Sequence, residues 1–565
     1  IFGSVEGSTA GGAALSNART DAEALATGLS AGDGNDQITS ATGINATTTA
    51  TATAVSAGLS VGMSIDGDVT SGAAVSDASS RAVTQATGID GDEGDDAITS
   101  TTGVDDTIVL LADSDAIGVA ASFTVAGSVS GAANAGDALS EARTDADALA
   151  TGITGGTGVD TILSNTSIDA TAESTATAVA AGFSVGIGNE GNVTTGTVVS
   201  DASSLATTRA VGIDGGADDD TIGGEDGITG GIVLSADSAA IGVAASFSVA
   251  GSVEGTAQAG DALSEARTDA DASAIGIGGG TGGDTLTSAT AIDATAGSTS
   301  TAVSVAGSVG VTVEGDVSAG AAVSDVSSSA ATQATGIGGG AGDDTITSAT
   351  AGDLAITTMA DSEANGVAAS FTVAGSVSGA ANAGDALSEA RTEASAAATG
   401  IAGDDGVDTV LSDTGIAATA ESTATAVAAG FSVSIGKEGD VTTGAAVSDA
   451  SSLATTRAVG IDGGADDDAI GGDEGVTGGI VLLADSAANG VAASFSVAGS
   501  AEGTAQAGDA LSAARTDADA EAIGIAGGTG GDTVTSATAI DGTASSTATA
   551  VAAGFSVGVT ADGDV

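Results

Sequence analysis

The sequence contains no proline, cysteine, histidine, tryptophan or tyrosine, and only 8 phenylalanines among 565 residues. Without cysteine, the chain has no disulfides and no thiol chemistry. Because histidine is missing too, ordinary zinc sites and Ser-His or Cys-His nucleophile pairs are excluded. The lack of proline suits extended sheets, where a proline would remove a hydrogen bond to a neighbouring strand. We therefore expect no enzyme and no catalytic residue.

Positive charge is also scarce, with 9 Lys and Arg against 75 Asp and Glu and a formal net charge of −66. Such a charge argues against nucleic acid and anionic membrane surfaces as partners. A compact body of this charge needs counter-ions, and multivalent cations are the obvious supply. High charge with few aromatic residues is also typical of disorder, but 42% hydrophobic residues in strict patterns favour a folded chain when such cations are present.

No run of about 18 apolar residues is long enough to span a bilayer. The chain begins at Ile1 without a methionine and stops within a repeat at Val565, so we expect a segment of a longer protein.

One nonapeptide recurs nine times, and its best copy is Gly339-Gly340-Ala341-Gly342-Asp343-Asp344-Thr345-Ile346-Thr347. Its sixth-place aspartates alternate at spacings of 60 and 64 residues: Asp36, Asp96, Asp160, Asp220, Asp284, Asp344, Asp408, Asp468 and Asp532. An aliphatic residue follows two places later in every copy: Ile38, Ile98, Ile162, Ile222, Leu286, Ile346, Val410, Ile470 and Val534. A near-identical block also returns at an offset of 248 residues. The pattern predicts one continuous array over residues 1–565, with about nine coils of about 62 residues.

The nonapeptide resembles the calcium-binding G-G-x-G-x-D-x-U-x repeat of RTX-type parallel β-rolls. The resemblance covers about one seventh of the chain, and the rest of each unit is unlike an ordinary β-roll. It implies that Ca²⁺ lies between successive loops, bound by the nine aspartates and by loop carbonyls. It also implies that the glycines open the loops, as Gly279 and Gly280 do for Asp284, and that Leu286 points into the core. The fourth-place glycines assigned to the metal sites are Gly34, Gly94, Gly158, Gly282, Gly342, Gly406 and Gly530. Asp218 and Asp466 replace this glycine in two copies, which puts the loop geometry there in question more than the binding.

Electrostatic repulsion favours a bound metal ion independently of this resemblance. Carboxylates stacked about 4.8 Å apart repel by roughly 3–4 kcal/mol per neighbouring pair at an effective dielectric of 20. A hard divalent cation with six to eight oxygen ligands turns this repulsion between carboxylates into a net attraction to the cation. Ca²⁺ suits such a site better than the strictly octahedral Mg²⁺. The alternative is that Asp and Gly merely form polar turns.

Between the nonapeptides the sequence has a period of two. From Ile168 to Gly186 the even positions are almost all Ala, Gly or Ser, and the odd positions carry Thr, Glu, Val and Phe183. This alternation predicts strands with one bare face and one bulky face, and two bare faces would pack unusually closely. A helix over residues 139–153 is the alternative, since Leu139, Ala142, Ala146 and Leu149 lie near helical spacing. In the next repeat unit the aligned residues do not keep this helical spacing of apolar side chains, so strands are favoured.

A glycine eight residues after the Phe position predicts the opposite turn, at Gly67, Gly131, Gly191, Gly255, Gly315, Gly379, Gly439, Gly503 and Gly563. Each unit then comprises a long strand, a turn, a second long strand and a calcium turn. The predicted fold class is all-β: a wide, flattened parallel β-solenoid with long sides of roughly 80 Å. An antiparallel hairpin lattice is the alternative, but it would not bring like turns into register.

Phenylalanine recurs at one repeat position, at Phe123, Phe183, Phe247, Phe371, Phe431, Phe495 and Phe555. Stacked, these residues form either a local core or an apolar seam for lateral self-association. Alternate units carry outward threonine rows such as Thr171, Thr175 and Thr177, and Asn45, Asn165 and Asn192 head glycosylation sequons; glycans are possible additional partners. Arg143 and its equivalents at 124-residue spacing have acidic neighbours, which predicts weak cross-coil ion pairs.

These features predict a secreted structural protein of the cell surface: an extracellular filament, sheath or surface-layer component that folds and stiffens on binding Ca²⁺. Its repeats would associate end to end, and laterally through the Phe positions. Fibrous cyanobacterial surface proteins of the oscillin type are similar in motif and composition. The alternative function is the stalk of a calcium-dependent RTX adhesin, which would carry a distinct globular tip beyond this segment.

Overall fold

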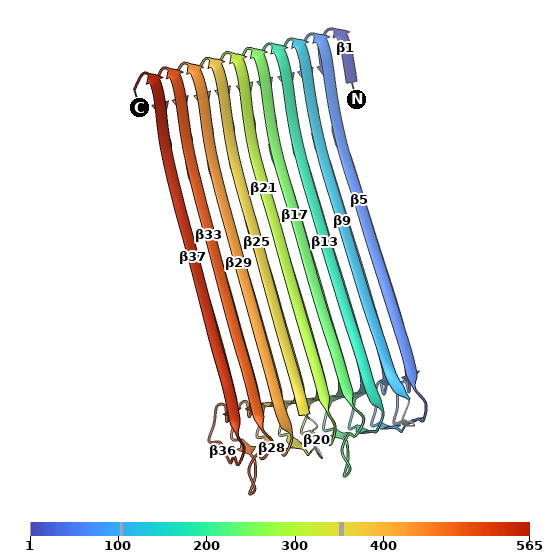
Figure 1. Cartoon of the computed structure of the whole chain (residues 1–565). Coiled ribbons are helices and arrows are strands. Elements are labelled where there is room, and N and C mark those ends of the chain that lie inside the picture. Colours follow the sequence, from blue (N-terminus) through green and yellow to red (C-terminus); the bar gives the residue numbers. More distant parts are fainter. Residues whose placement is uncertain (1, 102–105, 350–354, 565) are drawn as a thin grey trace.

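The computed structural model describes residues 2–101, 106–349 and 355–564, and their strands form four parallel sheets (Figure 1). Successive strands of every sheet pair in parallel, one coil apart, as in Ala138↔Val198 and Ile168↔Ile232. The described residues contain no helix. The predicted flattened parallel β-solenoid is therefore confirmed, and the helical and antiparallel alternatives are wrong.

Two wide sheets form the body of the solenoid. We call one the Phe sheet, because its strands carry every phenylalanine of the chain. Its strands are β1 (Phe2–Glu6), β5 (Ile44–Asp66), β9 (Thr107–Ser130), β13 (Ser167–Glu190), β17 (Ile232–Glu254), β21 (Ile292–Glu314), β25 (Ala355–Ser378), β29 (Gly415–Glu438), β33 (Ile480–Glu502) and β37 (Ile540–Asp562).

The other wide sheet carries every arginine and is called the Arg sheet. Its strands are β3 (Ala14–Ser30), β7 (Ala74–Asp90), β11 (Ala138–Thr157), β15 (Val198–Ala217), β19 (Ala262–Thr281), β23 (Ala322–Ala341), β27 (Ala386–Asp405), β31 (Ala446–Asp462) and β35 (Ala510–Ala526).

Two narrow sheets close the ends of each coil. At the glycine turn lie β2 (Thr9–Ala10), β6 (Val69–Thr70), β10 (Ala133–Asn134), β14 (Val193–Thr194), β18 (Ala257–Gln258), β22 (Val317–Ser318), β26 (Ala381–Asn382), β30 (Val441–Thr442) and β34 (Ala505–Gln506). Next to the nonapeptides lie β4 (Gln37–Ser40), β8 (Ala97–Ser100), β12 (Thr161–Ser164), β16 (Thr221–Ile222), β20 (Thr285–Ser288), β24 (Thr345–Ser348), β28 (Thr409–Ser412), β32 (Ala469–Ile470) and β36 (Thr533–Val534).

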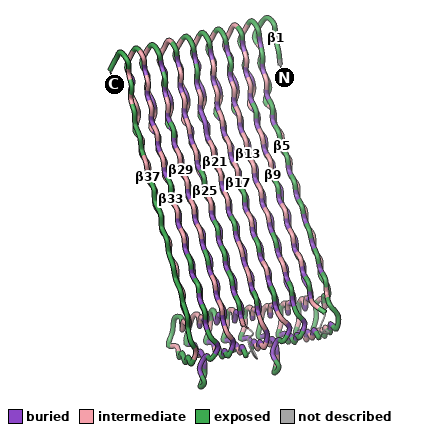
Figure 2. The backbone as a smooth tube through the Cα atoms, viewed as in Figure 1, coloured by how far each residue is buried: buried purple, intermediate pink, exposed green. Residues whose placement is uncertain are grey.

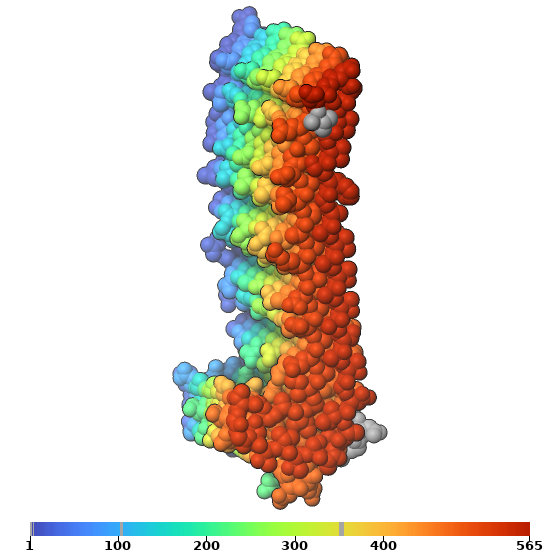
Figure 3. Space-filling view, turned by 90° about the vertical axis from the view of Figure 1, so that its left-hand side faces the viewer, coloured from blue at the N-terminus to red at the C-terminus, as the bar shows by residue number. Residues whose placement is uncertain are grey.

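The bare faces of the two wide sheets point inward, and burial alternates residue by residue along most of each interior strand (Figure 2). Ala142, Ala146, Ala176 and Ala180 are fully buried. The faces approach so closely that a Cβ built at Gly58 would lie 3.1 Å from the main-chain oxygen of Val75 on the opposite sheet. The space-filling view shows the resulting narrow slab (Figure 3).

The inner faces also contain serine and threonine, and many of their hydroxyls are hydrogen-bonded across the interior. Ser140 Oγ donates to the carbonyl oxygen of Ala181 at 2.6 Å, and Ser200 Oγ donates to that of Ala245 at 2.7 Å. Such bonds join the Arg sheet to the backbone of the Phe sheet, which avoids the cost of leaving a buried hydroxyl unpaired. The core is thus partly polar, and its larger side chains, such as Ile108 and Ile153, cluster with the aliphatic residues that follow the nonapeptides.

The alternation between 60 and 64 residues arises at one corner of the coil. Ile38 pairs with Ile98, 60 residues on, whereas Ile44 pairs with Ile108, 64 residues on. The extra residues therefore lie between the narrow strand after the nonapeptide and the next strand of the Phe sheet. Two of these insertions are described, at Gly223–Gly227 and Gly471–Gly475, and they protrude below the slab in Figures 1 and 2.

The seven phenylalanines from Phe123 to Phe555 lie on the outer face of the Phe sheet, and Phe123 retains 38% of its surface exposed. Phe123 and Phe183 stack with ring centroids 5.1 Å apart, and Phe431 and Phe495 do the same. The interpretation of these positions as a local core is therefore wrong. Alanine suffices inside because the inner faces are too close together for an aromatic ring.

Candidate metal-binding edge

The nonapeptides occupy one corner of the solenoid, between each strand of the Arg sheet and the following narrow strand. In the best copy β23 ends at Ala341 and β24 begins at Thr345, directly after Asp344. The turns stack into a ledge along the lower end of the slab, which shows nearly the full range of sequence colours in Figure 3. The downstream aliphatic residues point into the core in the interior coils, where Ile162 and Ile346 are fully buried.

The fourth-place glycines take a backbone conformation that side chains rarely adopt. Their φ angles lie between +118° and +149° at Gly34, Gly94, Gly158, Gly282, Gly342, Gly406 and Gly530. A Cβ at Gly342 would collide with the carbonyl of Gly282 in the preceding coil. These glycines therefore permit the turns to stack directly on one another.

The two departures from the motif keep a left-handed backbone. Asp218 and Asp466 have φ of +78° and +77°, a region that aspartate tolerates better than most residues. Two further aspartates, Asp92 and Asp404, occupy the second place with φ of +72° and +74°. The sequence had put the loop geometry of these copies in question. The left-handed conformation is retained there, although the φ angles of the aspartates are smaller than those of the equivalent glycines.

The sixth-place aspartates form a continuous ladder along the corner. Oδ1 of Asp344 accepts the main-chain N–H of Asp284 at 2.7 Å, and Oδ1 of Asp408 accepts that of Asp344 at 2.8 Å. The same bond joins every neighbouring pair from Asp36 to Asp532. One oxygen of each carboxylate from Asp96 onward therefore ties two coils together.

The second oxygen of each interior carboxylate is buried and has no hydrogen-bond partner. This holds for Oδ2 of Asp96, Asp160, Asp220, Asp284, Asp344, Asp408 and Asp468. These residues are at most 3% exposed. A buried carboxylate oxygen without a partner is costly, because charged groups inside proteins normally pair with an opposite charge or a metal. The seven orphaned oxygens form one column, one per coil.

The first-place glycine of the motif makes room for this oxygen. A Cβ built at Gly215 would lie 2.6 Å from Oδ2 of Asp220 and would also collide with the carbonyl oxygen of Gly279 in the next coil. Gly155, Gly279 and Gly339 have the same surroundings. A carboxylate oxygen and a main-chain carbonyl oxygen thus converge at each glycine. Oxygens of these two kinds are the ligands that Ca²⁺ takes in proteins, so the donor set fits the implied ion.

Burial of the ladder disfavours its charged form. It raises the pKa of Asp220 and Asp344 to about 7 and that of Asp160 and Asp408 to about 6, although the accepted N–H bond works in the opposite direction. Repulsion between neighbouring aspartates adds to the increase, as it does between Asp160 and Asp220. A cation at the orphaned oxygens would supply the missing compensation.

In residues 2–101, 106–349 and 355–564, no three acidic side chains lie close enough together to hold one metal ion between them. A cation at this edge would therefore be held by one or two carboxylates together with main-chain carbonyls. The terminal copies differ, since Asp36 and Asp532 are only half-buried. The structure thus stacks all nine predicted aspartates and all seven predicted glycines along one edge.

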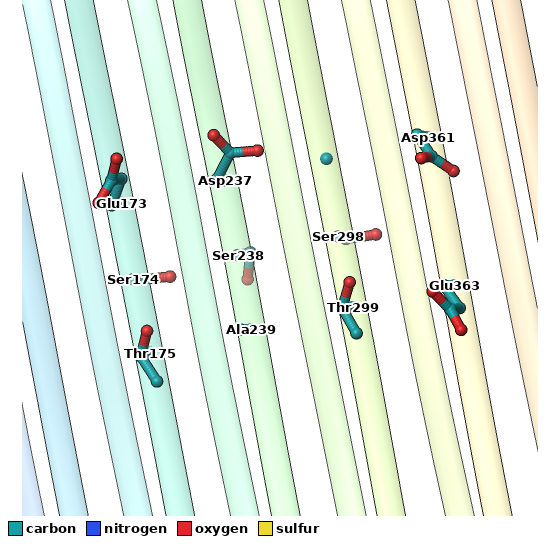
Figure 4. A pocket seen from close by; sticks show the side chains of 11 residues that line it. Glu173, Ser174, Thr175, Asp237, Ser238, Ala239, Ser298, Thr299, Asp361 and Glu363 are labelled. Atoms are coloured by element: carbon teal, nitrogen blue, oxygen red, sulfur yellow. The ribbon is translucent and has the colours of Figure 1, made fainter.

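A second acidic feature lies on the outer face of the Phe sheet. There Gly297 interrupts a column of carboxylates and leaves an open depression of about 310 Å³. Figure 4 shows Glu173, Asp237, Asp361 and Glu363 around it. All four side chains are exposed and none has a buried, unpartnered oxygen, so this depression lacks the features of the nonapeptide edge.

Sequence reasoning missed two features of the edge: the hydrogen-bonded role of Oδ1 and the second-place aspartates at positive φ. The first leaves no trace in the sequence, since it depends on the path of the backbone through the turn. The second was visible as Asp92 and Asp404 where other copies have Gly. No family model, curated protein or solved structure matches this chain. Within the described residues, no helix has the length and apolar character to cross a membrane.

Proposed function

We propose that this chain is a calcium-dependent structural element of an extracellular filament, sheath or surface layer. Its coils fold and stiffen when Ca²⁺ binds in the stacked nonapeptide turns, and copies of the chain associate into a larger assembly. The observation that carries the proposal is the column of orphaned Oδ2 atoms from Asp96 to Asp468. With its ladder carboxylates ionised, a solenoid that lacked cations would contain seven buried anions, each about one coil spacing from the next.

The proposed ion is Ca²⁺ because the ligands are hard oxygens set by a stacked backbone. Extracellular modules bind Ca²⁺ with dissociation constants of about 10⁻⁴–10⁻³ M, which matches a site with few carboxylates. A free-ion concentration of ten times the dissociation constant would add about 1.4 kcal/mol of stability for each site. Seven interior sites would then contribute on the order of 10 kcal/mol, which is comparable with the whole stability of a typical domain.

The first test follows the far-UV circular dichroism of the protein during titration with Ca²⁺ and then with EGTA. We expect a cooperative, reversible gain of β signal and of thermal stability that Mg²⁺ does not reproduce. A β spectrum and a melting temperature that are unchanged by EGTA would make the nonapeptides ordinary turns.

The second test replaces Asp284 and Asp344 with Asn. Asparagine keeps an oxygen for the N–H bond but removes the buried charge, so we expect the metal-free protein to be stabilised and the response to Ca²⁺ to shrink. Asp343→Asn is the matched control, because Asp343 is an exposed neighbour that also accepts a main-chain N–H, from Val407 at 3.0 Å. An equal loss of calcium response in the control would locate the binding elsewhere.

A further inference from the structure

The outer face of the Phe sheet contains a wide area without a single polar side chain. In β13 it comprises the outward residues Val179, Ala181, Phe183, Val185 and Ile187. Strand registers place Val, Ala, Phe, Val and Gly beside them in β17, and equivalent Val, Ala, Phe, Leu, Gly, Ile or Met residues in every strand from β5 to β37. We call this area the apolar band.

The size of the apolar band exceeds what a monomer normally exposes. Nine strands about 4.8 Å apart and eight residues of about 3.3 Å give roughly 40 by 27 Å, or about 1,000 Å². The largest apolar patch on a typical soluble monomer is about 300–600 Å², and a stable interface buries about 800 Å² on each partner. The band therefore has the area of a complete protein interface.

The pattern of projecting side chains on the band repeats every second coil. At one outward position large aliphatic residues alternate with glycine: Met63, Gly127, Ile187, Gly251, Val311, Gly375, Ile435, Gly499 and Val559. Ile187 and Ile435 are each 60% exposed. A Cβ built at Gly251, Gly375 or Gly499 would meet no atom within 4 Å. The surface thus presents projecting side chains and open gaps at a fixed period of about 9.6 Å, twice the strand spacing.

The aromatic ladder beside this position is closed at its one glycine, Gly307. Where Gly307 replaces phenylalanine, the rings of Phe247 and Phe371 lean over it, with centroids 5.9 Å apart and planes at 46°. These rings, which are nearly parallel from Phe123 to Phe247, thus close the gap over Gly307.

We propose that the apolar band binds the apolar band of a second copy of this chain, face to face. An offset of one coil sets the aliphatic residues of one copy opposite the glycine gaps of the other. Only a surface with the same two-coil period fills all the gaps at once, and a second copy has that period. This inference rests on the proposed structural function and deepens it, because it names the lateral contact between copies.

The charge distribution sets the conditions for this contact. The band itself is uncharged, but carboxylates border it on both sides, at Glu173 and Asp237 on one and at Glu190 and Glu254 on the other. Two such faces bring like charges together at the rim, where salt and bound cations screen them. We therefore expect pairing to strengthen with ionic strength and with Ca²⁺.

The first test introduces charge into the band with the double variant Val185→Glu and Val433→Glu, at equivalent places of the 248-residue repeat. The matched control, Thr175→Glu and Thr423→Glu, places the same charges on the outer faces of β13 and β29 outside the band. Sedimentation velocity with saturating Ca²⁺ should show a wild-type and a control dimer. The band variant should dissociate with a constant raised roughly 100-fold or more, since buried charges would lack partners.

The second test fills the gaps with the double variant Gly251→Val and Gly499→Val. Both glycines lie within strands under open space, so the isolated chain accommodates valine. We expect unchanged circular dichroism and a dimer weakened about tenfold or more. The control, Ala245→Val and Ala493→Val, adds apolar area in a column where Val305 already occurs, and should not weaken the dimer.

Four outcomes overturn the proposal: a folded wild-type monomer at all concentrations, association with lipid vesicles in place of self-association, equal dimers in the charged variant and its control, or a tighter dimer from the glycine variant. Dimers that persist while EGTA leaves folding unchanged would refute the calcium-dependent function and not the contact. Calcium-dependent folding of a strictly monomeric chain would refute the contact alone.

Discussion

The Phe sheet and the Arg sheet have the same inner face and opposite outer faces. Inward, both offer alanine, glycine and serine, and Ala142 and Ala176 are equally buried. Outward, the Arg sheet carries an acidic column through Asp77, Glu141 and Asp201 with arginines beside it. The Phe sheet has no arginine, and its only lysine is Lys437. The shared inner face therefore builds the fold, while the outer faces are free to diverge.

The divergence separates charge from apolar surface along the Phe sheet. Its carboxylates, such as Asp113 and Asp361, lie toward the nonapeptide end, where burial and the neighbours Asp115 and Glu363 raise their pKa. The apolar band occupies the other half of the same strands. On the Arg sheet ion pairs such as Arg267 with Glu265 relieve the acidic column, although burial still raises the pKa of Glu265. One outer face thus has an apolar half, whereas the other carries acidic residues and ion pairs.

The largest effect should come from breaking the shared inner face. Ala206→Phe places a ring where two closely packed sheets leave room for a methyl group, because Ala206 is fully buried. Thr207→Phe is the matched control, one residue along β15 on the outer face. Overpacking costs about 1–3 kcal/mol and sometimes more, so we expect at least about 3 kcal/mol for the inner variant by urea unfolding. Equal losses would mean that the inner face is not the main determinant of the fold.

The next effect concerns the corner that joins the two sheets. Without calcium, the folded pKa values of about 7 at Asp220 and Asp344 exceed the ordinary value of 3.8. The folded chain then retains protons that the unfolded chain has released. The resulting stability is fully present below about pH 4 and is lost as the pH rises through about 7. In EGTA the urea midpoint should therefore be higher at pH 5 than at pH 8.

A matched variant sharpens this pH test. Asp220→Asn with Asp344→Asn removes two of the titrating groups, so the difference in midpoint between pH 5 and pH 8 should shrink in EGTA. Saturating Ca²⁺ should favour the ionised carboxylates and raise the midpoint more at pH 8 than at pH 5. A metal-free midpoint that rises with pH would show that the ladder is solvated and carries no buried charge.

Much of this fold could be predicted from the sequence because each coil repeats the same sequence signals. The period of two, the registered nonapeptides and the turn glycines each recur in about nine copies, which averages out local exceptions such as Asp218. The periodicity could not reveal which face points inward. Burial of alanine in place of phenylalanine depends on the distance between the sheets, and that distance is a tertiary property.

The candidate edge was predictable in its residues but not in its hydrogen bonds. Stacking of Asp344 on Asp284 follows from the repeat length alone. In each interior carboxylate Oδ1 accepts a hydrogen bond and Oδ2 has no partner, and this difference depends on the path of the backbone through the turn. The place of the four-residue insertion was also hidden, since the 60 and 64 spacings do not say where within the coil the extra residues lie.

The smallest effect should come from the Arg sheet itself. Arg143 alternates along its column with Ser203, so Arg143→Ser copies the neighbouring coil. In its pair with Glu141 the Arg143 side chain is 65% exposed, and ion pairs of exposed groups contribute about 0–1 kcal/mol. Arg457→Ser should cost more, because Arg457 lies 2.9 Å from Asp462, whose side chain is only 19% exposed. Urea unfolding at low and high salt would rank the two variants. If both instead cost several kcal/mol, the arginines would be essential to the fold, and the difference between the outer faces would be structural as well as functional.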